Sequence, residues 1–198
     1  MSNAVPLSER LAPTPLDASL DILAEKLLGS KNGFYVGHKS LLVRPLRAVG
    51  PISGVLERNA PDGWKSFYEI DLSSHVFFAE NLLGEQFSLC ASGVYRFDPE
   101  TAELECVGAS LEDWAKWLLS DLDFVTGRPL AEAWVRCHGP LPDGVRLLPR
   151  VPLVLGGDFG IDNMVAVQDF TGMKSRSELA NQLRGLSDGA EVVIDIVA

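Results

Sequence analysis

The sequence contains only three cysteines, and they lie far apart: Cys90, Cys106 and Cys137. It has no CxxC pair and no even-numbered cysteine framework, so neither a disulfide scaffold nor a cysteine-rich zinc site is indicated. Its three histidines are equally scattered, and we predict no metal site. We expect the thiols to be buried structural groups in a protein of a reducing compartment.

Long apolar runs and a basic surplus are also lacking. No stretch approaches the roughly 20 apolar residues of a membrane span, and the N-terminal segment MSNAVPLSERLAPTP has no signal-peptide core. The chain has 17 Lys and Arg against 27 Asp and Glu, a net charge of −10. Nonspecific nucleic-acid binding requires a basic surface. We therefore expect a cytoplasmic protein that binds neither membranes nor nucleic acids.

No pattern in the sequence is typical of a known catalytic mechanism. The triplet Asp158-Phe159-Gly160 matches a kinase metal motif, but the glycine-rich loop and catalytic loop of kinases are missing. We interpret it as a turn between two strands. A GxSxG elbow is absent, and the acidic residues show no pattern of a paired-carboxylate cleft. We predict a protein without catalytic residues or cofactor, and not an enzyme.

Acidic residues are present in excess, and they are concentrated. Residues 77–121 hold nine acids and two bases, a net charge of −7, whereas residues 1–76 are balanced at eight of each. Such a block can act as a solubilising edge or as a docking face for a basic partner. The sequence alone leaves both interpretations open.

Hydrophobic periodicity and turn residues predict the element order. We expect an N-terminal arm over residues 1–15 and a single domain over residues 16–198. Helices are predicted over residues 17–28, from the Ser110 cap onward, from Pro129 onward and over residues 177–185. Short, turn-bounded apolar segments typical of strands occur at 34–36, 41–43, 66–72, 75–79, 85–90, 94–98, 104–107, 145–149, 152–157, 164–168 and 191–198.

Most of these segments are linked as hairpins. The link at residues 91–93 contains a glycine, and Asp98-Pro99-Glu100-Thr101 has proline at its favoured turn position. We therefore predict an α+β fold: a single domain whose mainly antiparallel (mixed) sheet has about six to seven strands, with helices packed on it.

Six segments in one order resemble a protein family. They are FFAENLLGEQF, GVYRFDPET, SLEDWAKWLL, TGRPLAEAW, RLLPRVPLVLGGDFGIDNM and LANQLRGLSDG. This succession resembles a bacterial branch of the SUKH superfamily, which includes the yeast Smi/Knr cell-wall synthesis regulator. The resemblance extends over about residues 32–198. It implies a SUKH-like α+β domain and supplies no catalytic residues.

The resemblance also implies a function. Bacterial SUKH proteins are linked to immunity against polymorphic toxins, often nucleases. We therefore predict a non-enzymatic immunity protein that binds and neutralises a cognate toxin domain, with an acidic face docking on a basic cleft. The alternative is a regulatory or scaffold module for protein interactions without a toxin partner. The candidate partner contacts are Glu80, Glu85, Asp98, Glu100 and Glu103.

Overall fold

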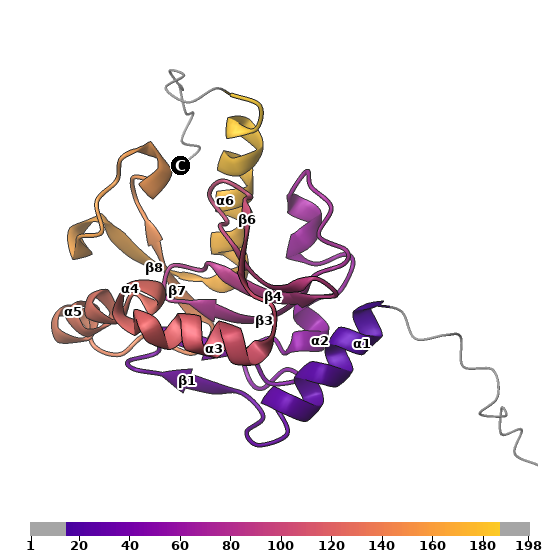
Figure 1. Cartoon of the computed structure of the whole chain (residues 1–198). Coiled ribbons are helices and arrows are strands. Elements are labelled where there is room, and N and C mark those ends of the chain that lie inside the picture. Colours follow the sequence, from indigo (N-terminus) through magenta and orange to yellow (C-terminus); the bar gives the residue numbers. More distant parts are fainter. Residues whose placement is uncertain (1–14, 187–198) are drawn as a thin grey trace, which may run out of the picture.

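The protein is built on an antiparallel sheet of six strands, which pair in the order in which they occur in the chain (Figure 1). The computed structural model describes residues 15–186, with side chains from residue 18 onward. The strands are β1 (Phe34–Val36), β2 (Leu41–Val43), β3 (Val76–Asn81), β4 (Gln86–Cys90), β5 (Gly93–Phe97) and β6 (Leu104–Gly108). A separate hairpin pairs β7 (Val145–Pro149) with β8 (Met164–Gln168).

Helices cover both faces of the large sheet. The α-helices are α1 (Pro15–Ile22), α2 (Val55–Arg58), α3 (Leu111–Ser120), α4 (Leu122–Thr126), α5 (Arg128–His138) and α6 (Asp169–Leu183). Short turns of other helix types are η2 (Leu23–Leu27), η3 (Trp64–Phe67), η4 (Leu153–Leu155) and η5 (Ile161–Asn163). Figure 1 shows α1 and α3 on one side of the sheet and α6 on the other.

Local chemistry fixes where these elements begin and turn. The Ser110 hydroxyl accepts a hydrogen bond from the Asp113 amide at 3.2 Å and so caps α3, as predicted. The β4–β5 hairpin closes at the pair Cys90 and Gly93. Gly93 has φ +136°, and a Cβ there would lie 2.5 Å from the Gly108 carbonyl oxygen, so the turn requires glycine.

The central strand β3 is buried on both faces, and this divides the core in two. Val76 and Phe78 pack into the cluster beneath α1 and α3, which includes Trp114. Phe77 points to the opposite face and packs with Trp64 near α6. Successive side chains of a strand alternate between faces, so one strand supplies both clusters.

A third apolar cluster joins the small hairpin to α5. Leu147 of β7 and Met164 of β8 pack with Trp134 of α5 and with Leu82, which follows β3. The Leu147 amide also donates to the Leu82 carbonyl oxygen at 3.0 Å. The hairpin is therefore attached at the end of the central strand β3 by packing and by a backbone hydrogen bond.

The predicted fold class is confirmed: the protein has an α+β architecture with a six-stranded antiparallel sheet and packed helices. Two predicted strands are wrong. Residues 66 and 67 are the end of the turn η3, and residues 68–72 continue from it without strand pairing. Residues 152–157 form η4 and a tight turn. The predicted strand over residues 191–198 and all but the last residue of the predicted arm lie outside the described residues.

The cysteine environments also differ from expectation. Cys106 and Cys137 are exposed, and Cys90 is half-buried. Cys106 lies on the edge strand β6, which has solvent on one face, and Cys137 lies in the last turn of α5. Within residues 15–186, no helix is long and apolar enough to cross a membrane.

Candidate functional site

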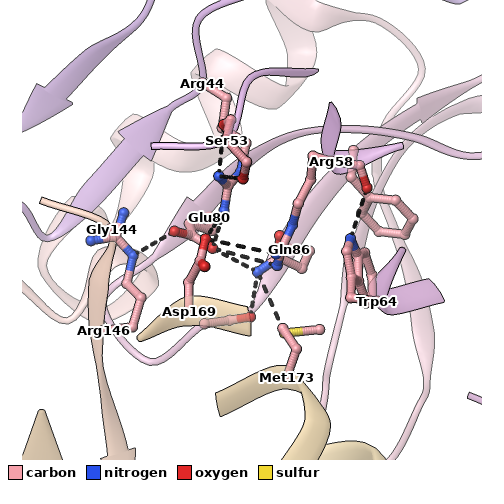
Figure 2. A network of polar contacts seen from close by, with 12 residues as sticks. Arg44, Ser53, Arg58, Trp64, Glu80, Gln86, Gly144, Arg146, Asp169 and Met173 are labelled. Atoms are coloured by element: carbon pink, nitrogen blue, oxygen red, sulfur yellow. Dashed lines mark hydrogen bonds and ion pairs between the residues drawn. The ribbon is translucent and has the colours of Figure 1, made fainter. Parts of the chain in front are cut away.

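A cluster of charged side chains is buried beneath the sheet, centred on Glu80 of β3 (Figure 2). Arg44 Nη2 lies 2.7 Å from Glu80 Oε2, and Arg146 Nε lies 2.8 Å from Oε1. The Gln86 side-chain amide donates to Oε2 at 3.0 Å. Each carboxylate oxygen of Glu80 therefore has a charged partner, and the three charged residues are no more than 1% exposed.

A second acid extends the cluster toward α6. Asp169, the first residue of α6, accepts a hydrogen bond from Arg44 at 2.8 Å. Arg58 of α2 approaches both acids less closely, at 3.8 Å from Glu80 and 3.7 Å from Asp169. Its guanidinium group lies over the Trp64 ring at 4.8 Å, a cation–π geometry.

The charges of the cluster perturb each other strongly. Burial opposes ionisation of Glu80, but the attraction of Arg44 and Arg146 outweighs it and lowers the pKa of Glu80 below its usual range. Burial, and then repulsion by Arg44, lowers the pKa of Arg58 to about 10. Both groups therefore remain charged at neutral pH.

This cluster connects five parts of the chain. Arg44 follows β2, Arg58 belongs to α2, Glu80 to β3, Arg146 to β7 and Asp169 to α6. Ion pairs of this kind fix the relative position of the elements that carry them, because separating the charges leaves them buried and unpaired. The pairing of Glu80 on both oxygens fits a structural role for its carboxylate.

Sequence reasoning did not identify the arginines of this cluster. Arg44 follows the apolar run Leu41–Val43, and Arg146 lies within the strand Val145–Pro149. A charge inside an apolar strand segment is a signal of a buried pair. The sequence alone could not show which residue would pair with it, because Arg44 and Asp169 are 125 positions apart.

The structure separates the five predicted partner contacts into two groups. Glu80 is fully buried and Glu100 is 7% exposed, so neither carboxylate can serve as a surface contact as predicted. Glu100 instead accepts a hydrogen bond from the Val154 amide at 3.0 Å, and burial raises its pKa. Glu85 and Asp98 are half-buried, and only Glu103 of the five is exposed.

The more accessible acids lie beside an open hollow at the β5–β6 hairpin. The hollow has a volume of about 600 Å³. Its lining residues are Arg96, Asp98, Glu103, Leu104 and Glu105. Arg96 pairs with Glu105 at 2.7 Å and approaches Glu85 at 3.6 Å. With three acids and one base, the hollow presents a net negative surface to solvent.

Glu85 gives the site a pH-dependent element. Burial raises its pKa to about 7, against the opposing attraction of Arg96. Its carboxylate also accepts a hydrogen bond from the side-chain amide of Asn81 at 2.6 Å. Because the folded protein holds this proton more tightly than the unfolded chain, Glu85 costs stability as the pH rises from its ordinary pKa to about 7.

We therefore expect E85Q to gain stability over the unmodified protein as the pH is raised. Glutamine keeps a hydrogen-bond acceptor and cannot ionise, so the difference should be small at pH 4 and reach up to about 3 kcal/mol at pH 8. Urea unfolding across this range measures it. E103Q, which neutralises an exposed acid of the neighbouring β5–β6 turn, is the control and should show the pH dependence of the unmodified protein. If E85Q showed the same pH dependence of stability as the unmodified protein, the raised pKa of Glu85 would be contradicted.

A second hollow of about 240 Å³ lies between α1 and α3 and is lined partly by Ile22, Leu89 and Ser110. Within residues 15–186, no group of three or more His, Cys, Asp and Glu side chains is arranged to hold a metal ion. The hollow at the β5–β6 hairpin, called the acid-lined hollow from here on, has a larger net charge than the second hollow.

Comparisons with known proteins give no family. No protein-family model matches the chain, and no curated protein matches it significantly. Among solved structures it is similar to Atu4351 from Agrobacterium tumefaciens, with a TM-score of 0.49 and 12% sequence identity, over 82% of this chain and 80% of that one. The resemblance to the SUKH superfamily stays a prediction.

Proposed function

We propose that this protein is a non-enzymatic immunity protein that binds and neutralises a cognate toxin domain in the cytoplasm. The observation that carries the proposal is the acid-lined hollow, in which Asp98, Glu103 and Glu105 outnumber the single base Arg96. A negative surface favours association with a positive one and steers the encounter. A nuclease fits this chemistry, because its substrate cleft must attract phosphate groups.

In this mechanism the immunity protein acts by occlusion. Carboxylates at the hollow pair with the lysines and arginines that would otherwise contact nucleic acid, so the substrate cannot enter. The buried cluster around Glu80 contributes indirectly, because it fixes the sheet and the small hairpin relative to each other. No bond of the toxin is broken, and inhibition requires one protein for each toxin molecule.

We expect the variant D98N/E103Q/E105Q to lose protection. The test is co-expression with a toxin domain encoded by a neighbouring gene, scored by growth, together with the affinity of the purified pair at low and high salt. Loss of three surface ion pairs at about 0.5 kcal/mol each should weaken binding about tenfold at low salt. The affinity of the variant for the toxin domain should also depend less on salt concentration than that of the unmodified protein.

The matched control is D21N/E25Q/E178Q, which removes three exposed acids from α1, η2 and α6. It changes the net charge equally and should protect as well as the unmodified protein. Unchanged affinity and salt dependence in D98N/E103Q/E105Q would overturn the acidic interface. Absence of a neighbouring toxin gene, or no protection by the unmodified protein, would favour the regulatory or scaffold alternative.

A further inference from the structure

The loop between β7 and β8, residues 150–163, is held in one shape by its own hydrogen bonds. The Asn163 side chain accepts from the Val151 amide at 2.8 Å and donates to the carbonyl oxygens of Val151 at 3.0 Å and Asp158 at 2.8 Å. The Gly157 amide donates to the Pro152 carbonyl oxygen at 3.0 Å. A segment bonded in this way presents a preorganised surface.

Side chains of this loop differ in their burial. Leu153 and Ile161 pack against the cluster of α5, β7 and β8 and anchor the loop. Four apolar side chains face solvent: Val151, Val154, Leu155 and Phe159, with exposed fractions of 51%, 44%, 36% and 60%. Nine consecutive positions thus carry four exposed apolar groups, whereas single exposed apolar residues elsewhere are ordinary.

Acidic groups border this apolar surface. The Glu100 carboxylate accepts a hydrogen bond from the Val154 amide, which places the β5–β6 turn against the loop. Asp98, whose carboxylate accepts from the Glu100 amide at 2.8 Å, belongs to the same turn and also lines the acid-lined hollow. Within the loop, Asp158 and Asp162 are exposed, and Arg150 is the one base.

We propose that the β7–β8 loop is the apolar centre of a docking surface for a basic protein segment: an aliphatic or aromatic side chain flanked by lysine or arginine. Interfaces of this kind place an apolar anchor at the centre and charged groups at the rim. The apolar part is the surface of Val154, Leu155 and Phe159. The charged part is Asp98 and Glu103 of the turn beside it, because Glu100 is buried. This deepens the proposed function and rests on it, since it names how a basic toxin domain is held.

The test uses the full chain and a phage-displayed library of short random peptides as the probe. We expect enriched peptides to carry an aliphatic or aromatic residue beside lysine or arginine, and to bind more weakly at high salt. The variant L155S/F159S should weaken binding of these peptides about tenfold or more, as for loss of an interface anchor. Urea unfolding should show that this variant remains folded, because both side chains face solvent.

The control is L119S/F124S, which removes two exposed apolar side chains from α3 and α4. It should bind the peptides within about twofold of the unmodified protein, as surface changes outside an interface do. Enrichment of no peptide, enrichment of peptides without basic residues, or equal binding by L155S/F159S would overturn the proposal. So would a concentration-dependent dimer that L155S/F159S abolishes, because a second copy would then be the occupant.

The same variants distinguish this proposal from the immunity function. If L155S/F159S protects cells from the neighbouring toxin while D98N/E103Q/E105Q does not, the loop assignment fails and the immunity function stands. If peptides bind as expected but the unmodified protein gives no protection, the docking surface stands and the toxin assignment fails.

Discussion

Replacing Glu80 by glutamine is expected to destabilise the protein by about 3–5 kcal/mol, the cost of removing one partner from a buried ion pair. Arg44 and Arg146 would keep their positive charges, at 0% and 1% exposure, without the carboxylate that faces them at 2.7 and 2.8 Å. Glutamine retains the volume and one acceptor, so a cavity does not contribute. Urea unfolding at neutral pH measures the loss. For a domain of ordinary stability, this is a large fraction of the total.

The control for this substitution is E103Q, which removes an exposed acid in the turn between β5 and β6 and should change stability by less than about 0.5 kcal/mol. The pH dependence of the E80Q effect provides a second test. The pKa of Glu80 is lowered in the folded protein, so its contribution is complete above the ordinary glutamate pKa and is lost as the pH falls toward the folded value. The difference in free energy of unfolding between E80Q and the unmodified protein should therefore become smaller at low pH. A difference that is small at neutral pH would show that the arginines find other partners.

The acidic block illustrates what the sequence could and could not predict. Net charge and its position are properties of the chain, and the hollow at the β5–β6 hairpin does lie within residues 77–121. Burial depends on tertiary contacts. Glu80 and Glu103 both belong to the acidic block, yet Glu80 is buried among arginines from distant segments and Glu103 is exposed. An acid inside the apolar run of β3 is the one local sign that separates them.

The fold was predictable where local and tertiary preferences agree. The hairpin β4–β5, the turn at Pro99 and the Ser110 cap depend on short-range chemistry, and all are present. Residues 152–157 are apolar enough for a strand, but Gly156 adopts φ +87° and the segment turns back on itself. An apolar run without strong period-2 alternation does not distinguish a strand from a packed turn. The sequence therefore does not reveal the packed turn at the start of the β7–β8 loop.

Replacing Trp64 is expected to cause the second large loss of stability, because its ring is packed in the core. It is 1% exposed and makes ring contacts with Tyr68, Phe77 and Phe97 at centroid distances of 5.7, 4.8 and 5.7 Å. Its indole N–H donates to the Arg58 carbonyl oxygen at 3.0 Å. We expect W64A to lose about 3–5 kcal/mol, the usual cost of removing a buried aromatic ring. W117A, which removes a half-buried ring from α3, should lose clearly less in the same urea experiment.

A double-mutant cycle with R58M then separates packing from the cation–π contact. Arg58 is the cation of the cluster with the weakest pairing: within residues 15–186 its Nε and Nη2 atoms have no hydrogen-bond partner, and its guanidinium group lies over the Trp64 ring at 4.8 Å. If the stacking stabilises the buried charge, W64A and R58M should be non-additive by about 0.5–2 kcal/mol. Additive losses would show that Trp64 acts by volume alone. In that case Arg58 is retained in the interior by Glu80 and Asp169, despite distances of 3.8 and 3.7 Å.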